Sequence, residues 1–318
     1  KNLAGISDET MNDNAFSVPA SMRILERGWL SSNNVLFIGR DETALVDTGY
    51  MSHAPQTLAL VEHELGGRRL DRVLNTHLHS DHCGGNAALQ ARYGSRVAIP
   101  VAEADKVRAW DEEALSFRAT GQQCERFTFD DTLTPGDELV LGDLPWRVHG
   151  APGHDPHSVI LHCEQEGILI SADALWHNGF GVIFPELDGE SGFEEARATL
   201  ELIDTLDVRL VIPGHGAPFT DVKAAIARAL ARVDFLSASP KRNAENAVKV
   251  LLKFLLLSRQ EIPLAEVWKM FETVPLLVST AKRYFEWPAD QMAEWTVHSL
   301  VRAGAAKREN GMLINREF

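Results

Sequence analysis

Three histidines and one aspartate are crowded into the seven residues T-H-L-H-S-D-H at positions 76–82. His77 and His79 lie two positions apart at the end of a predicted strand. Side chains at i and i+2 of an extended chain point the same way, so both imidazoles can reach one ion. Asp81 and His82 follow in the predicted turn before a helix, where they can face a second ion. The spacing therefore indicates a metal site rather than ordinary turn residues.

Three further residues of ligand type each follow a predicted strand. His154 lies in a Gly/Pro turn, Asp173 ends the strand 168–171, and His215 stands between two glycines. Strand ends are where α/β proteins place their functional sites. Imidazole and carboxylate ligands suit two divalent ions, preferably zinc, with iron or manganese as alternatives.

The first two thirds of the chain alternate short β-like runs with helical ones, which predicts a layered α/β protein. The predicted strands are 34–39, 44–47, 70–75, 97–100, 138–141, 145–149, 158–162, 167–170 and 209–212, and the predicted helices are 53–65, 86–93, 102–110 and 193–206.

Beyond position 221 the pattern becomes helical, and it ends in a predicted hairpin at 306–314 with Asn310-Gly311 as its turn. The predicted helices are 222–235, 243–258, 263–272, 275–284 and 289–303, with 237–240 as a hinge. Helices followed by a hairpin resemble a winged-helix module. We therefore expect two domains, 1–222 and 223–318, the second small and mainly helical.

Composition narrows the class of protein. With 318 residues, 45% hydrophobic and 24% charged, the chain can bury a core and is typical of soluble globular proteins. A net charge of -14 disfavours non-specific binding of nucleic acid. Three cysteines argue against a disulfide framework. No membrane-spanning run or signal peptide is visible, so we expect a cytoplasmic protein.

The motifs H-L-H-S-D-H, G-H, S-A-D and G-H-G together resemble those of the metallo-β-lactamase superfamily, over about residues 16–220. The resemblance implies a four-layer αββα sandwich. It also implies that the first metal is bound by His77, His79 and His154, the second by Asp81, His82 and His215, and that Asp173 bridges both. Asp47 would steady the histidine loop by hydrogen bonding. Ala172 departs from the family, which commonly has glycine there.

The resemblance further implies a hydrolase in which a hydroxide held by two metals attacks a carbonyl carbon or phosphorus. Asp81 would be the catalytic residue that accepts the hydroxide proton. Family members with a bridging carboxylate tend to cleave thioesters, phosphodiesters or lactones, and a thioester, as in glyoxalase II-like enzymes, is our preferred substrate. The alternatives are a metal-dependent endoribonuclease or phosphodiesterase, an iron-dependent oxidoreductase, and a non-enzymatic regulator.

Several other residues receive a structural interpretation. We expect Cys83 to fill a buried space, and His149, His157 and His162 to be structural. The aromatic and Gly-rich segment 176–181 could form a wall of the substrate cleft. Basic residues of the tail are interleaved with acids, so a nucleic-acid partner is possible but not favoured. We expect a small-molecule substrate, and the tail could support a homodimer.

Overall fold

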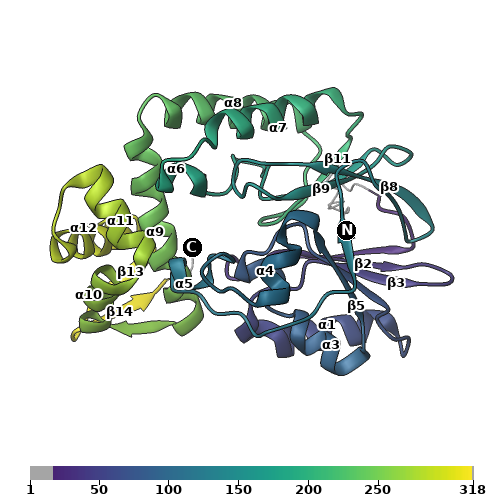
Figure 1. Ribbon diagram of the computed structural model, residues 1–318, viewed down its shortest axis with the longest axis horizontal. Helices are drawn as coiled ribbons and strands as arrows, with labels where there is room; N and C mark the ends of the chain where they lie inside the picture. Colours follow the sequence, from purple (N-terminus) through teal and green to yellow (C-terminus); the bar gives the residue numbers. More distant parts are fainter. Residues whose placement is uncertain (1–16, 317–318) are drawn as a thin grey trace, which may run out of the picture.

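The computed structural model describes residues 17–316, so the first 16 residues of the predicted catalytic domain and residues 317–318 lie outside the described part. The two larger sheets of the chain are faced by helices (Figure 1). The first sheet has the order β1-β2-β3-β4-β5-β6. Its strands are β1 (Met22–Leu25), β2 (Asn34–Ile38), β3 (Thr43–Val46), β4 (Arg72–Leu74), β5 (Arg96–Pro100) and β6 (Asp131–Leu133).

The second sheet has the order β11-β10-β9-β8-β7, and only its β10–β11 pair is parallel. Its strands are β7 (Glu138–Leu141), β8 (Leu144–Gly150), β9 (Val159–Cys163), β10 (Ile168–Ala172) and β11 (Leu210–Pro213). The parallel pair brings the ends of β10 and β11 to the same edge of the sheet, where the residues that follow each strand can meet.

Alternating side chains bury both faces of each sheet. In β2, Val35 and Phe37 point into the core between the sheets, whereas Leu36 joins the core beneath the outer helices. In β10, Ile168 and Ile170 face the first sheet and Leu169 faces the helices on the other side. This period of two is what a strand covered on both faces requires.

Helices cover the outer face of each sheet and complete four layers, which confirms the expected αββα sandwich. The segments on or near the first sheet are η1 (Met51–His53), α1 (Ala54–Leu65), α2 (Ser80–Cys83), α3 (Asn86–Tyr93), η2 (Val101–Glu103), α4 (Ala104–Ala109) and α5 (Phe117–Thr120). Those on the second are α7 (Phe193–Thr205) and α8 (Val222–Ser237), whereas α6 (Phe184–Asp188) packs its Leu187 into the C-terminal core.

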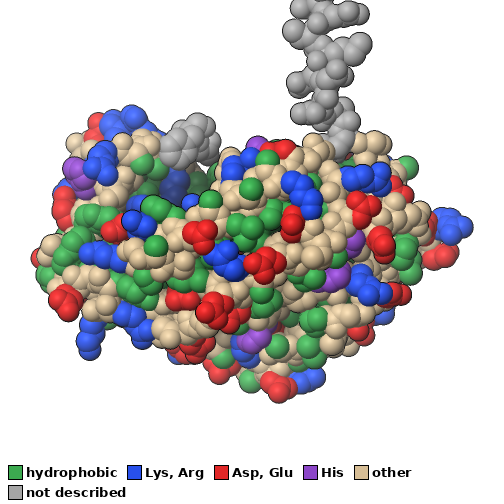
Figure 2. Space-filling view, turned by 90° about the horizontal axis from the view of Figure 1, so that it is seen from above, with side chains coloured by type: hydrophobic (Ala, Val, Ile, Leu, Met, Phe, Trp, Pro, Cys, Tyr) green, Lys and Arg blue, Asp and Glu red, His purple; other side chains and the backbone are tan. Residues whose placement is uncertain are grey.

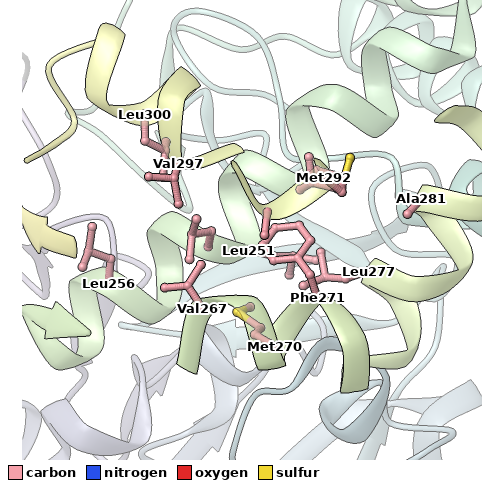
Figure 3. Packing of buried hydrophobic residues seen from close by; sticks show 14 of the residues in the cluster. Leu251, Leu256, Val267, Met270, Phe271, Leu277, Ala281, Met292, Val297 and Leu300 are labelled. Carbon is pink, nitrogen blue, oxygen red and sulfur yellow. The ribbon is translucent and has the colours of Figure 1, made fainter. Parts of the chain in front are cut away.

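The remaining chain builds another core around one long helix, and Val182 and Leu187 also contribute to it (Figure 3). Its elements are α9 (Pro240–Arg259), β12 (Glu261–Pro263), α10 (Leu264–Thr273), α11 (Pro275–Thr280), η3 (Ala281–Phe285), α12 (Ala289–Arg302), β13 (Ala306–Glu309) and β14 (Met312–Asn315). Leu251, Phe271, Leu277 and Met292 meet in this core. The hairpin β13–β14 turns at Asn310-Gly311 as predicted, and β12 adds a third strand that sequence reasoning missed.

The C-terminal region is thus helical, while its winged-helix likeness stays a prediction. So does the division at residue 222. Because α8 shares its core with α7, whereas α9 belongs to the C-terminal core, we propose that the boundary lies in the turn between α8 and α9. None of the helices formed by residues 17–316 is both long enough and apolar enough to span a bilayer.

Candidate metal centre

Strand ends from both sheets place all seven predicted ligands together. His77 and His79 follow β4, and Asp81 and His82 lie in the short helix α2. His154, Asp173 and His215 follow β8, β10 and β11. Their ligand atoms form two clusters, one of His77, His79 and His154 and one of Asp81, His82, Asp173 and His215.

The histidine loop is held close to the loop after β3 by two glycines. A Cβ at Gly85 would overlap the backbone oxygen of Thr48, and a Cβ at Gly84 would overlap the backbone nitrogen of Met51. Thr48 also accepts the backbone N–H of Gly85 on its hydroxyl, at 3.1 Å. Only glycine permits this close approach of the two loops.

Three ring nitrogens converge in the first cluster. His79 Nδ1 lies 3.1 Å from His77 Nε2 and 2.8 Å from His154 Nε2. Nitrogens bound tetrahedrally to one zinc ion lie roughly 3.3 Å apart, given bonds of about 2.0–2.1 Å. The spacing is therefore close to that of ligands sharing one ion.

The chemistry of the first cluster also suits a cation. His154 Nδ1 donates to the backbone oxygen of Val182 at 2.6 Å, which leaves Nε2 with its lone pair toward the cluster. Burial, together with nearby His79, lowers the pKa of His154 to about 4. Burial and the neighbouring histidines hold the pKa of His77 well below its usual range. Neutral imidazoles, which metal binding needs, are thus favoured.

The second cluster contains two carboxylates and two imidazoles. His215 Nε2 lies 3.0 Å from Asp81 Oδ2, and His82 Nε2 lies 3.5 Å from Asp173 Oδ1. His82 Nε2 is buried and has no hydrogen-bond partner among residues 17–316. A buried polar atom without a partner is costly, and a bound cation would satisfy it.

Three carboxylates surround His82, and a bound cation would neutralise part of their negative charge. Burial alone would lower the pKa of His82, but Asp173, Asp47 and Asp81 together raise it well above the usual range. His82 Nδ1 donates to Asp47 Oδ2 at 2.8 Å, and Asp47 also accepts the backbone N–H of Thr76 at 2.9 Å. Asp47 therefore ties the histidine loop to the end of β3, as the resemblance implies.

Asp173 lies between the two clusters. Its Oδ2 is 3.4 Å from His154 Nε2 in the first, and its Oδ1 is 3.5 Å from His82 Nε2 in the second. The preceding Ala172 has a φ of 47°, in the left-handed region that favours glycine. This geometry explains why glycine is common before the aspartate in the family and shows that alanine adopts the same turn here at a cost in backbone strain.

A third group of ligand-type residues, Glu103, Asp155 and His157, lies beside the first cluster. His157 and Lys106 both engage Glu103, which leaves this group internally paired. Asp155 Oδ2 lies 3.8 Å from His79 Nε2, the ring nitrogen that faces away from the cluster. We therefore interpret the group as an ion-pair network that orients His79. Sequence reasoning missed Asp155, although its position directly after His154 was a signal.

The other residues weighed in the sequence lie elsewhere. His149 and His162 face each other on neighbouring strands, with ring centroids 6.0 Å apart, outside the two clusters. Cys83 is fully buried and its sulfur lies 3.8 Å from that of Cys124. Cysteines 83, 124 and 163 are all free thiols.

A cavity of about 710 Å³ opens over the clusters. His79, Asp81, His154, Asp173 and His215 form part of its floor. Its walls include four residues of the predicted segment 176–181, namely Trp176, Asn178, Phe180 and Gly181, and a face of α9. The ring of Trp29 stacks on His215 at 5.6 Å and also borders the cavity. Pockets of this volume are typical of small-molecule sites.

The fold and this arrangement of histidines and aspartates define a metallo-hydrolase fold of the αββα type. Residues 27–215 match the family model of the metallo-beta-lactamase superfamily, and the chain belongs to that superfamily.

Curated proteins of similar sequence are named as hydrolases or thioesterases. The chain is 29% identical to a hydroxyacylglutathione hydrolase of Maricaulis maris over 157 residues, 48% of this chain and 52% of the relative. It is 28% identical over 218 residues to the human protein named acyl-coenzyme A thioesterase MBLAC2, covering 60% and 76%. The chain spans about half the length of the first curated relatives it matches.

The fold likeness extends further along the chain than the sequence matches. A metallo-beta-lactamase family protein of known structure from Thermus thermophilus superposes with a TM-score of 0.57 at 21% identity. That comparison covers 93% of this chain and 99% of the other. It supports the fold, including the helical C-terminal region.

Proposed function

We propose that the protein is a metal-dependent hydrolase that cleaves an acyl thioester. The observation that carries the proposal is the carboxylate of Asp173, which lies within 3.5 Å of histidine nitrogens from both clusters under a cavity of about 710 Å³. Relatives named for hydrolysis of glutathione and coenzyme A thioesters support the choice of substrate class.

His77, His79 and His154 would hold one divalent ion, and Asp81, His82 and His215 the other, with Asp173 between them. Zinc suits this ligand set, with iron or manganese as alternatives. When bound, such ions lower the pKa of water toward neutrality and stabilise negative charge on a carbonyl oxygen.

The protein's own residues would orient the reaction. Asp81 borders the cavity and its Oδ2 lies 3.0 Å from His215 Nε2, so its carboxylate is fixed at the cavity floor and can accept a proton there. Trp176 donates from Nε1 to Asp173 Oδ1 at 3.2 Å, which fixes that carboxylate's rotamer. Trp29 and Trp176 cover His215 and restrict access of bulk water.

The nucleic-acid alternative receives no support from the face of the molecule seen in Figure 2. Figure 2 shows acidic and basic side chains interspersed over the face that carries α7 and α8, without a continuous basic patch there. The preferred substrate remains a small molecule that enters the cavity.

Asp173→Asn tests the proposal. Replacing the shared carboxylate removes a negative charge from both clusters, so we expect bound metal to fall from about two ions per chain toward one, and thioester turnover to fall at least about a hundredfold. Elemental analysis and a panel of acyl thioesters, lactones and phosphodiesters measure both effects. Asp234→Asn, an exposed aspartate paired with Arg197, is the control. Metal-dependent turnover of phosphodiesters but of no acyl substrate would reject the proposal.

A further inference from the structure

Helix α9 has two faces with different surroundings. One face, with Ala244, Val248 and Leu252, is buried in the C-terminal core. The opposite face lines the cavity over the metal clusters. Its residues recur at helical spacing and are Asn246, Lys249, Val250, Lys253, Phe254 and Leu257. The C-terminal region therefore supplies a wall of the catalytic cavity.

This wall mixes apolar side chains with cations. Val250 is 40% exposed, and Phe254 and Leu257 are only partly buried, so an apolar strip faces the open cavity. A solvent-exposed apolar strip beside a reactive site is typical of a surface that buries an apolar ligand.

Arg232 of α8 borders the same cavity. None of the ion pairs found among residues 17–316 involves Arg232 or Lys249. The Nε of Arg232 is buried and lacks a hydrogen-bond partner within the described chain. Because an unsatisfied buried donor is costly, an acceptor supplied by a bound ligand would stabilise this side chain.

Local packing fixes this guanidinium on the metal side of the cavity. It lies over the ring of Phe180, 5.6 Å from the centroid. A Cβ at Gly179 would lie 2.9 Å from Arg232 Cδ, and a Cβ at Gly181 would overlap the ring of His154. Segment 179–181 thus packs against Arg232 through Gly179 and Phe180, and against His154 through Gly181.

We propose that Arg232 and the cavity face of α9 form the recognition surface for an amphipathic acyl thioester. An apolar acyl chain would lie against Val250, Phe254 and Leu257, and an anionic group of the thiol carrier, phosphate or carboxylate, would pair with Arg232 and Lys249. Planar guanidinium binds both anions through paired hydrogen bonds. This inference rests on the proposed function and names its substrate class.

Binding of non-hydrolysable S-alkyl thioethers tests the surface without requiring turnover. Ethyl, hexyl and decyl thioethers of coenzyme A, glutathione and the uncharged N-acetylcysteamine are titrated into the metal-loaded protein by calorimetry. We expect affinity to rise about threefold per added methylene until the apolar strip is covered. We also expect an anionic carrier to bind at least about tenfold tighter than the uncharged one. Preference for coenzyme A indicates phosphate, and preference for glutathione indicates carboxylate.

Variants assign these effects to residues. Arg232→Met should abolish the preference for the anionic carrier and leave the chain-length dependence, whereas Val250→Asp should flatten the chain-length dependence. Lys249→Met gives an independent test of the charge effect. Lys269→Met and Val301→Asp are matched controls, because Lys269 is exposed on α10 and Val301, 37% exposed, lies on α12 outside the cavity.

The two proposals fail in different ways. Equal binding of all chain lengths and carriers, or wild-type binding by both Arg232→Met and Lys249→Met, overturns the recognition surface even if thioesters are hydrolysed. Chain-length- and Arg232-dependent binding without turnover of the matching acyl thioesters supports the surface and overturns the proposed reaction.

Discussion

At the scale of the residue, the orientation of each histidine depends on what its second ring nitrogen contacts. His82 donates to Asp47, His154 donates to the backbone oxygen of Val182, and His77 Nδ1 lies 3.1 Å from the hydroxyl of Thr76. These contacts fix the orientation of each imidazole and therefore determine which ring nitrogen points into the clusters. Partners of this kind commonly contribute ten- to a hundredfold, roughly, in metal affinity.

His79 has Asp155 as the nearest such partner, and Asp155→Asn tests its role. The carboxylate lies 3.8 Å from His79 Nε2, so loss of its charge should weaken binding of the first metal about tenfold. Competition with a chromogenic chelator measures the change. Asp105→Asn, on exposed Asp105 of α4, is the control. Unchanged affinity would show that Asp155 does not orient His79.

The low pKa of His154 predicts how the metal-free protein responds to acid. Its folded-state pKa is about 4 against an ordinary value of 6.5. Between these values the unfolded chain takes up a proton that the folded chain does not, so the free energy of unfolding falls as pH falls from 6.5 to about 4. His154→Asn should make this fall shallower. Urea midpoints in chelator measure it, with exposed His63→Asn expected to keep the wild-type slope.

Local spacing made the seven clustered residues predictable, because all of them stand in short motifs that follow apolar strands. Asp155 and Arg232 were not predicted. Their contacts with His79 and Phe180 join segments 76 and 52 positions apart. The position of Asp155 directly after His154 marks it as close to the site, but the local sequence does not show which residue it contacts, and nothing local marks Arg232.

At the scale of the element, the end of β11 shows how a strand terminus is shaped to the site. A Cβ at Gly214 would overlap Asp173 Oδ1 and lie 3.0 Å from His82 Cε1. Two residues on, Gly216 has open space around its Cβ position but a φ of +85°. The two glycines are therefore required for different reasons, one for space and one for backbone conformation.

Alanine at each position separates these reasons. Gly214→Ala should displace the carboxylate and imidazole of the second cluster and lose bound metal while the chain stays folded. Gly216→Ala should keep its metal and lose about 1 kcal/mol of unfolding free energy. Elemental analysis and urea unfolding read out the two effects. Full metal content in Gly214→Ala would contradict the packing argument.

Sequence periodicity predicted most elements, including the hairpin at Asn310-Gly311, because apolar spacing reports which face is buried. It did not predict β1, β6 or β12. These edge strands are three or four residues long, too short to establish a period, and pairing with a longer neighbour decides their conformation.

At the scale of the whole molecule, hydrogen bonds from Asn243 and Tyr284 help to join the C-terminal core to the catalytic sandwich. The side chain of Asn243 in α9 donates to the backbone oxygen of Ile183 at 2.8 Å and accepts its N–H at 3.3 Å. The hydroxyl of Tyr284 donates to the backbone oxygen of Glu186 in α6. Ile183 and Glu186, which accept these hydrogen bonds, follow Phe180 closely in the chain.

Asn243→Ala would leave both backbone groups of Ile183 buried without their partner. We expect a loss of about 1–3 kcal/mol in unfolding free energy. Because α9 would shift, KM for the preferred thioester should rise. Urea unfolding and steady-state kinetics measure these effects, and Asn246→Ala, in the cavity wall, should raise KM without the loss of stability.

The carbonyl of Val182 that accepts the Nδ1 proton of His154 belongs to the residue just before Ile183. The dipeptide Val182-Ile183 is therefore held both by a metal ligand, His154, and by Asn243 near the start of α9. Loading with metal should therefore slow proteolytic cleavage at 237–240, and chelation should hasten it. Metal occupancy would then change the accessibility of a linker that contains none of the metal-binding residues.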